Sequence, residues 1–202
     1  MKSAFLLLCG GLWLALLGGG TAWMLRYENT SGTVGVAPAE WPGGSPLRRV
    51  RGEATLIMLA HPKCPCTGAS MDELAALMAE NAGRVSAHVL FLKPEKMQDD
   101  WTKTTLWRTA AAIPGVTVST DDGGKEAARF GGETSGDVLL YDARGRLAFH
   151  GGITVARGHV GENAGHTSLN HLLAGDQTSQ TRTPVFGCPL TAAHCASAPA
   201  RP

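Results

Sequence analysis

The sequence predicts an α/β domain, with a partly parallel sheet flanked by helices, behind an N-terminal helix long enough to cross a membrane. Three observations lead to this fold class: an uncharged apolar run at the start, alternating strand-like and helix-like segments after it, and a pair of cysteines between the first strand and its helix. The 202 residues suffice for one domain of ordinary size with extensions.

The first segment is typical of a transmembrane helix or signal anchor. Residues 4–25 form a run of 22 uncharged residues, and about 20 apolar residues span a bilayer. We therefore expect residues 1–26 to anchor the protein, with residues 4–25 in the membrane and the domain on the extracytoplasmic, periplasmic side. The small residues 20–22 leave signal-peptide cleavage open, and a cleaved protein would be secreted.

The remaining chain divides into three expected parts. Residues 27–46 are rich in Gly, Pro and Ser without an apolar period, which is typical of a flexible linker. Residues 47–175 carry the alternating pattern of the domain, and residues 176–202 form a polar tail that contains Cys188 and Cys195. The net charge of +1 and the charged fraction of 17% give no indication of a nucleic-acid partner.

The domain begins with a buried strand and an amphipathic helix. Residues 54–60, ATLIMLA, are continuously apolar, as in a strand covered on both faces. Met71, Leu74 and Met78 then recur at helical spacing until the turn-forming residues 81–83. The two cysteines lie between these elements.

The later segments continue the alternation and include a hairpin, so the expected order is β-α-β-α-β-α-β-β-α. After the first helix, we expect a strand at 85–92, a helix around Trp101 to Trp107, a strand at 115–120, a short helix at 125–130, a hairpin at 137–152 with its turn at 142–145, and a helix around 168–173.

Cys64 and Cys66 form a C-x-C motif with Pro65 between them. Residues two apart on a helix lie about 160° apart around its axis, so the two sulfurs cannot bond if both lie in regular helix. Because proline is favoured at the first helical position, we expect Cys64 before the helix and Cys66 in its first turn. Unpaired backbone N–H groups there, with His61 and Lys63 nearby, favour thiolates.

Three roles for these thiols are open. In a redox role, which requires no cofactor, Cys64 is the nucleophile because it precedes the helix and is not buried in its first turn, and Cys66 resolves it. A disulfide across one residue is strained, so Cys188 or Cys195 is an alternative partner. In a metal role, His61, Cys64 and Cys66 bind copper or zinc. In a structural role, the cysteines form disulfides in a non-enzymatic anchored module.

A loop rich in glycine and histidine, residues 156–166, precedes the last helix. It carries Arg157, His159 and His166, which are able to form a polar site. A glycine-rich surface loop is the more frequent explanation of such a segment, and we adopt it.

The strand, the HPKCPC motif, the amphipathic helix and the VSAHVLFL strand together resemble the thioredoxin-like superfamily, over about residues 56–173. More narrowly, HPKCPCTGAS, TSGDVLLYDARGRLAFHGGIT, RGHVGENAG and VFGCPL resemble the RedB group of bacterial thioredoxin-like proteins. The resemblance implies a thioredoxin-like fold, a central mixed sheet flanked by helices, with Cys64 and Cys66 at the position of the redox loop.

Two departures from ordinary thioredoxins bear on function. The cysteine spacing is C-x-C, and the segment that matches the cis-proline position of thioredoxins contains no proline. In thioredoxins that proline helps to position a substrate peptide and shields the thiols from metals. Its absence here weakens the implied disulfide reductase activity and favours the copper or zinc role, in which the chain would resemble copper-handling thioredoxin-fold proteins of cytochrome oxidase assembly.

The expected function is that of a membrane-anchored, extracytoplasmic thiol–disulfide oxidoreductase, with peroxidase-type activity as a variant. Its expected partner is a protein thiol or disulfide. The residues expected to line the site, besides the cysteines, are His61, Lys63, Pro65, Thr134, Ser135 and Gly136.

Overall fold

The computed structural model describes residues 2–176 and 179–190, and the chain divides into two units, Met1–Thr30 and Ser31–Pro202. The predicted tail cysteine, Cys195, lies outside the described residues.

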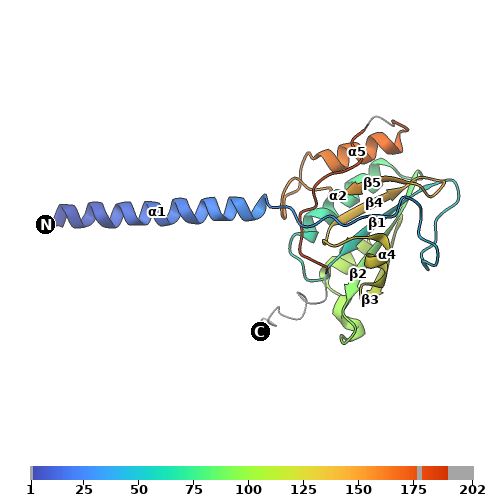
Figure 1. The fold of residues 1–202 in the computed structure, drawn as a ribbon, viewed down its shortest axis with the longest axis horizontal. Helices are drawn as coiled ribbons and strands as arrows, with labels where there is room; N and C mark the ends of the chain where they lie inside the picture. The colour runs from blue at the N-terminus through green and yellow to red at the C-terminus, as the bar shows by residue number, and fades with distance from the viewer. Residues whose placement is uncertain (1, 177–178, 191–202) are drawn as a thin grey trace. The chain divides into compact units, whose positions relative to one another are not determined.

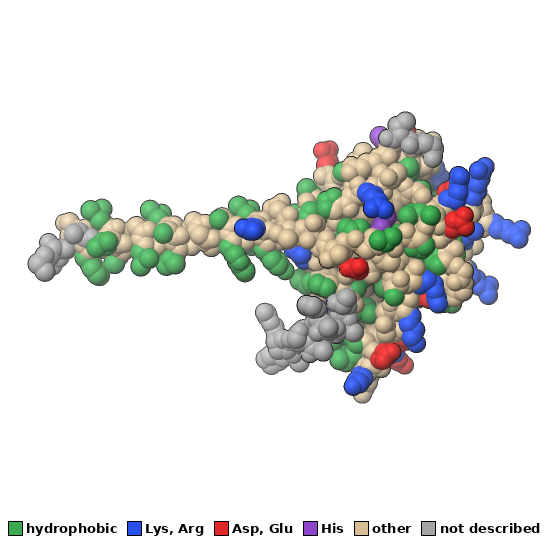
Figure 2. Space-filling view, in the orientation of Figure 1, with side chains coloured by type: hydrophobic (Ala, Val, Ile, Leu, Met, Phe, Trp, Pro, Cys, Tyr) green, Lys and Arg blue, Asp and Glu red, His purple; other side chains and the backbone are tan. Residues whose placement is uncertain are grey.

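The first unit is a single apolar helix. α1, Lys2–Glu28, has 27 residues, and its segment Phe5–Glu28 is long and apolar enough to cross a membrane, with a mean hydropathy of 1.8. Consecutive side chains such as Leu7 and Leu8 are exposed, so the apolar surface runs around the whole helix. Figure 2 shows these hydrophobic side chains along α1. The predicted candidate for a membrane span is therefore confirmed.

The second unit is built on a five-stranded mixed sheet with the strand order β3-β2-β1-β4-β5 (Figure 1). The central strand β1, Ala54–Ala60, pairs in parallel with β2, Val85–Lys93, and antiparallel with β4, Asp137–Tyr141. β3, Val116–Asp122, lies parallel to β2, and β5, Leu147–Gly151, completes the hairpin with β4. The expected partly parallel sheet with a late hairpin is confirmed.

Helices follow the strands as expected, but the bounds of several differ from the prediction. The helix predicted around Trp101 to Trp107 is broken, because Lys103 has a non-helical ψ of 48°. The final helix begins earlier than predicted, because the Asn163 side chain caps it by accepting a hydrogen bond from the His166 N–H at 2.8 Å. The helical elements are α2 Thr67–Glu80, the 3₁₀ turn η1 Asp99–Thr102, α3 Thr105–Ala111, α4 Lys125–Phe130 and α5 Ala164–Leu173.

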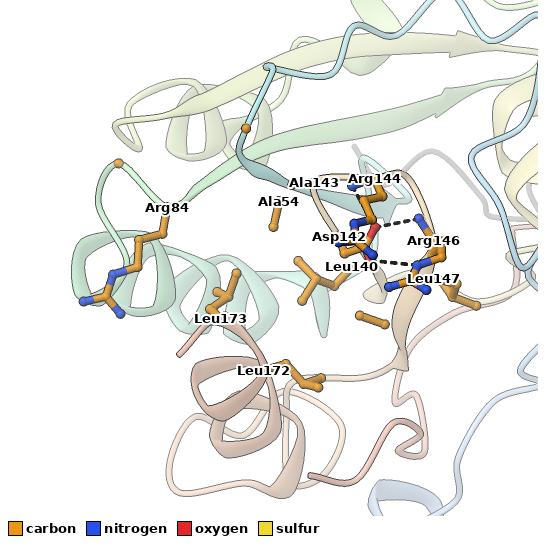
Figure 3. Close-up of a pocket in the computed structure, with 13 residues that line it drawn as sticks. Ala54, Arg84, Leu140, Asp142, Ala143, Arg144, Arg146, Leu147, Leu172 and Leu173 are labelled. Carbon is orange, nitrogen blue, oxygen red and sulfur yellow. Dashed lines mark hydrogen bonds and ion pairs between the residues drawn. The ribbon is translucent and has the colours of Figure 1, made fainter. Parts of the chain in front are cut away.

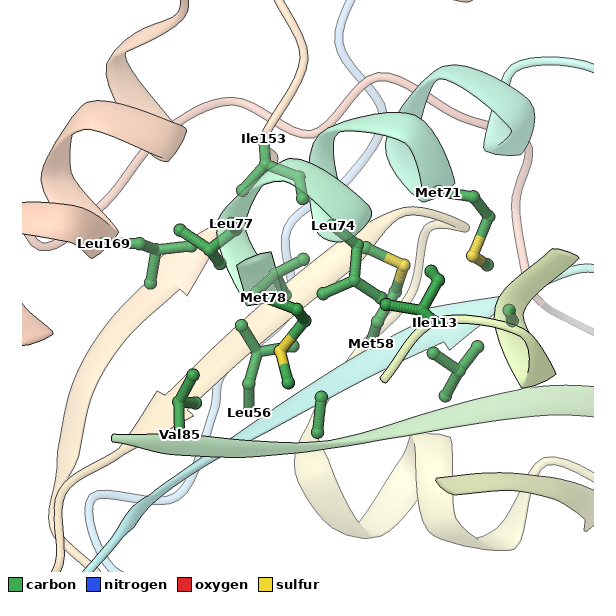
Figure 4. Close-up of a cluster of buried hydrophobic side chains, with 14 of the residues drawn as sticks. Leu56, Met58, Met71, Leu74, Leu77, Met78, Val85, Ile113, Ile153 and Leu169 are labelled. Carbon is green, nitrogen blue, oxygen red and sulfur yellow. The ribbon is translucent and has the colours of Figure 1, made fainter. Parts of the chain in front are cut away.

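The core lies on both faces of β1, as the continuous apolar strand predicted. Leu56 and Met58 join one cluster with side chains of α2 and α5 (Figure 4). Ile57 and Leu59 point to the opposite face, where they join a second cluster with Phe130 of α4. Each such buried side chain contributes about 1.5–3 kcal/mol to folding, so β1 is a rigid base for the turn that follows it.

Residues 32–46, the larger part of the expected linker 27–46, belong to the second unit and are tied to it by specific contacts. The Trp41 N–H donates to the Gly145 carbonyl at 2.7 Å. The Trp41 ring packs edge-on against Phe130 and Tyr141, with ring centroids 5.1 and 5.3 Å away. This single aromatic anchor and the backbone hydrogen bonds carry no sequence periodicity, which explains why composition alone indicated a linker.

Candidate redox site

The cysteine motif lies in the connection between β1 and α2. α2 begins at Thr67, and Cys66 precedes it with φ −70° and ψ −24°. Two turns form this connection: the Cys64 N–H donates to the His61 carbonyl at 3.1 Å, and the Thr67 N–H donates to the Cys64 carbonyl at 3.2 Å. The expected placement of Pro65 at the first helical position is therefore wrong, although both cysteines do lie at the N-terminal end of α2.

Burial reverses the expected order of access to the two thiols. Cys64 is 1% exposed and Cys66 is 7% exposed, whereas Cys188 is partly exposed. The expectation that Cys64 avoids burial because it precedes the helix is wrong, since the folded turn buries it beside the C-terminal segment, residues 181–190, which carries Cys188.

Cys188 joins the motif from the far end of the chain. The thiols of Cys188 and Cys66 both hydrogen-bond to the sulfur of Cys64, and the Thr67 side chain and the Cys188 backbone N–H add two further hydrogen bonds. These three cysteines are free thiols in the structure. The cluster therefore has Cys64 at its centre, with one thiol from its own turn and one from the C-terminal segment.

Hydrogen bonding shifts the pKa of Cys64 in one direction and those of Cys66 and Cys188 in the other. The hydrogen bond from Cys188, followed by that from Cys66, holds the pKa of Cys64 well below its usual range, although burial opposes the shift. The same hydrogen bonds to Cys64, together with burial, raise the pKa of Cys66 and of Cys188. The positive charge of Arg157 opposes both upward shifts.

The loop before β4 holds the segment that carries Cys188. The Ser135 N–H donates to the Cys188 carbonyl at 2.8 Å. Thr134 forms an isolated antiparallel bridge with Pro189. Two of the residues expected to line the site therefore contact a part of the same chain by strand-like backbone pairing.

Ser135 also joins this loop to the cysteine turn. Its Oγ accepts a hydrogen bond from the His61 N–H at 2.8 Å and lies 2.7 Å from the Thr67 Oγ1. Gly136 has a φ of 89° and lies so close to Ser70 that a Cβ atom would be 2.8 Å from its Oγ. Thr67 was not among the predicted site residues, and its position directly after the motif was the available signal.

His61, Lys63 and Pro65 are near the motif but serve different contacts. The His61 Nδ1 accepts a hydrogen bond from the Lys63 N–H at 3.2 Å, and burial lowers the pKa of His61, while the negative charge of Cys64 opposes this shift. Lys63 is exposed, with its Nζ 3.4 Å from the ring centroid of Trp101. A shallow hollow of about 280 Å³ adjoins this turn and is lined by residues 62–65 and 104–106.

Arg157 is the site residue that was missed, because its loop was interpreted as a glycine-rich surface loop. Its guanidinium hydrogen-bonds to Cys66 and also donates to the Gly187 carbonyl. Glu73 of α2 ties the same loop down, with Oε1 accepting from the Gly161 N–H at 2.8 Å and Oε2 lying 2.7 Å from the His166 Nδ1. A glutamate on the buried face of an amphipathic helix was a signal for this contact.

Two other features bear on the choice of site. Within residues 2–176 and 179–190, no group of three or more His, Cys, Asp or Glu side chains is arranged to hold a metal ion.

A larger cavity of about 820 Å³ lies at the opposite end of β1, near Ala54 (Figure 3). Its Asp142 carboxylate is used by the backbone N–H groups of Arg144 and Arg146 within the hairpin turn.

No protein-family model matches the chain, and no curated protein matches its sequence. Among solved structures, a hypothetical protein from Sinorhizobium meliloti 1021 is similar, with 20% identity over 80% of this chain and 93% of that chain and a TM-score of 0.58. An uncharacterized conserved protein from Geobacillus kaustophilus has 17% identity over 81% of this chain and 92% of that chain, also with a TM-score of 0.58.

A weaker match is a secreted Mycobacterium tuberculosis disulfide oxidoreductase homologous to E. coli DsbE, with 15% identity over 62% of this chain and 83% of that chain and a TM-score of 0.43. At these identities, similarity informs the fold alone. The parallel β1-α2-β2 unit, the antiparallel β4-β5 hairpin beside β1 and the cysteines between β1 and α2 give this chain a thioredoxin-like fold.

Proposed function

We propose that the protein is a membrane-anchored, extracytoplasmic thiol–disulfide oxidoreductase of the RedB group, with Cys64 as its reactive thiolate. The supporting observation is the cluster of Cys64, Cys66 and Cys188, in which two thiols donate hydrogen bonds to one buried sulfur. Thiolates, rather than thiols, carry out exchange, so a cysteine with a lowered pKa beside further thiols has the required chemistry.

The cluster supplies the parts that the exchange reaction needs. A thiol of low pKa is a good leaving group, and a neighbouring sulfur within hydrogen-bonding contact can form the intramolecular disulfide. The positive charge of Arg157 favours the thiolate forms of Cys66 and Cys188 and so opposes the upward shifts of their pKa values. The expected partner is a protein dithiol or disulfide, and no cofactor is required.

The proposed location follows from α1 and from the chemistry of the site. α1 is the membrane anchor in this account, and disulfides form and persist outside the cytoplasm. A domain that uses an oxidised cysteine pair therefore suits the extracytoplasmic side.

A redox titration of the full-length protein in detergent tests the proposal. The protein is equilibrated with glutathione buffers of increasing potential, and its remaining thiols are counted by alkylation and mass spectrometry. We expect one transition in which a pair of thiols is lost, and no such transition in Cys64→Ser. Cys9→Ser, in α1, is the matched control and should behave as wild type. A transition that persists in Cys64→Ser, or its absence in wild type, would contradict the proposal.

A further inference from the structure

We infer that Cys188, and not Cys64, is the thiol that exchanges with the partner, and that Cys64 reacts only with Cys188 inside the protein. This inference rests on the proposed thiol–disulfide function and assigns the sulfur that meets the substrate. The substrate class is a dithiol that is oxidised, or the corresponding disulfide that is reduced.

Access separates Cys188 from the other thiols of the cluster. Cys64 and Cys66 are 1% and 7% exposed, and Cys188 is partly exposed. The hollow lined by residues 62–65 and 104–106 adjoins Cys64 without exposing it. Exchange requires the incoming thiolate to reach the sulfur that it attacks, so we assign the first attack to Cys188, the one residue of the cluster that is partly exposed.

The segment that carries Cys188 has a built position along the edge of the sheet. Its start pairs with β5, where the His150 N–H donates to the Thr181 carbonyl at 3.0 Å and Thr183 Oγ1 donates to the Gly152 carbonyl at 2.7 Å. An added Cβ at Gly152 would lie 2.5 Å from the Pro184 carbonyl oxygen. The backbones therefore meet at a distance that only glycine allows.

The end of the segment is equally close to the loop before β4. An added Cβ at Gly187 would overlap the Ser135 carbonyl oxygen, and the Ser135 N–H donates to the Cys188 carbonyl at 2.8 Å. Arg157 also donates to the Gly187 carbonyl. Cys188 is therefore fixed with its sulfur against Cys64, in the manner of an extended peptide docked on the Thr134–Ser135 backbone.

The exchange starts from the oxidised protein, in which Cys64 and Cys188 share a disulfide, and it proceeds in two steps. One thiolate of the partner attacks the Cys188 sulfur, so that a partner–Cys188 disulfide forms, the Cys64–Cys188 bond breaks and Cys64 leaves as a thiolate. The partner's second thiolate then attacks the partner sulfur bonded to Cys188, and Cys188 leaves and takes up a proton. The partner dithiol loses two electrons, and the protein gains them as one thiolate and one thiol.

The roles of the two sulfurs follow from their surroundings. The hydrogen bonds from Cys66, Thr67 and the Cys188 backbone N–H stabilise negative charge on Cys64, and a stabilised thiolate leaves faster. In the reverse direction, Cys188 passes its proton to the Cys64 thiolate and, as a thiolate, attacks a partner disulfide, so that a Cys188–partner disulfide forms and the first partner sulfur leaves as a thiolate and takes up the proton from Cys64. The Cys64 thiolate then attacks the Cys188 sulfur, the Cys64–Cys188 disulfide forms, and the second partner sulfur leaves as a thiolate. In both directions, Cys188 reacts with the partner and Cys64 reacts only with Cys188.

The test uses the oxidised full-length protein in detergent and glutathione, a monothiol that cannot complete the second step. The mixture is quenched with acid, alkylated and mapped by mass spectrometry. We expect glutathione on Cys188, with Cys64 carrying the alkyl group, in wild type and in Cys9→Ser. Glutathione first on Cys64 or Cys66 overturns the inference but leaves the proposed function intact. Absence of glutathione from all three cysteines contradicts the proposed function itself.

A variant strengthens the assignment without relying on the transient species. Cys64→Ala removes the internal nucleophile, so glutathione disulfide should leave a stable adduct on Cys188 that persists at least about tenfold longer than in wild type. Loss of this adduct at the wild-type rate would show that Cys64 does not resolve Cys188. Protection of the β1 backbone amides from hydrogen–deuterium exchange, measured in parallel, shows whether the variant is folded.

Discussion

The pKa of Cys64 depends on its neighbours in space. The sequence predicted activation by the N-terminal end of α2 with help from His61 and Lys63. In the structure, the largest cause of its lowered pKa is the hydrogen bond from Cys188, followed by that from Cys66. A residue on the C-terminal segment therefore has the largest effect on the pKa of a residue that follows β1.

This dependence predicts the effect of Cys188→Ala in the reduced protein. Wild type should retain the ultraviolet absorbance of a thiolate below about pH 7, where a cysteine of ordinary pKa, about 8.5, is protonated. Cys188→Ala removes the main donor and should shift the Cys64 titration to higher pH, while Cys9→Ser should not shift it. Titration of wild-type Cys64 near pH 8.5, or the same curve in Cys188→Ala, would contradict this account.

At the scale of elements, the local pattern predicted the strands and helices well, and close contacts between segments were beyond it. The continuous apolar run predicted β1 because both of its faces are covered. The break at Lys103 was missed, because no glycine or proline marks it. The late start of α2 was missed because Pro65 lies in a turn, where proline is as acceptable as at the first helical position.

Gly187, which directly precedes Cys188, gives a prediction at this scale. Gly187→Ala should lower the free energy of unfolding by about 1–3 kcal/mol, because the added Cβ overlaps the Ser135 carbonyl oxygen and forces the segment to shift. In Gly68→Ala, the matched control, the new Cβ has no other atom within 4 Å, so the change should be neutral or stabilising by up to about 1 kcal/mol. Denaturant unfolding measures both.

The same two variants also test whether the position of the Cys188 segment affects the pKa of Cys64. If the Cys188 segment positions the exchange thiol, Gly187→Ala should also shift the Cys64 titration to higher pH, and Gly68→Ala should leave it unchanged. Equal stability and equal titration curves for the two variants would show that the segment is not held by this close contact.

Across the whole molecule, the site joins segments that are far apart in the chain. The motif and the family resemblance predicted that Cys64 and Cys66 follow β1 and that Thr134 to Gly136 lie nearby. Four cysteines allow three pairings, so the contact between Cys64 and Cys188 was one option among several. Arg157 becomes part of the site only through the fold, because the loop that carries it has the composition of an ordinary surface loop.

The arrangement also links the site to the proposed location. The chain combines an N-terminal apolar helix with a thioredoxin-like domain, and the C-terminal segment that carries the proposed exchange thiol, Cys188, pairs with that domain through Thr134 and Pro189. In the proposed orientation, the anchor keeps that thiol in a compartment where oxidised cysteines persist.

The most direct test of the central claim is the identity of the disulfide in the oxidised full-length protein. The protein is oxidised with glutathione disulfide, its free thiols are blocked, and its disulfide-linked peptides are sequenced by mass spectrometry. The account predicts a Cys64–Cys188 bond with Cys66 blocked as a free thiol. A Cys64–Cys66 bond, or a bond of Cys188 to Cys195 with Cys64 free, would contradict it.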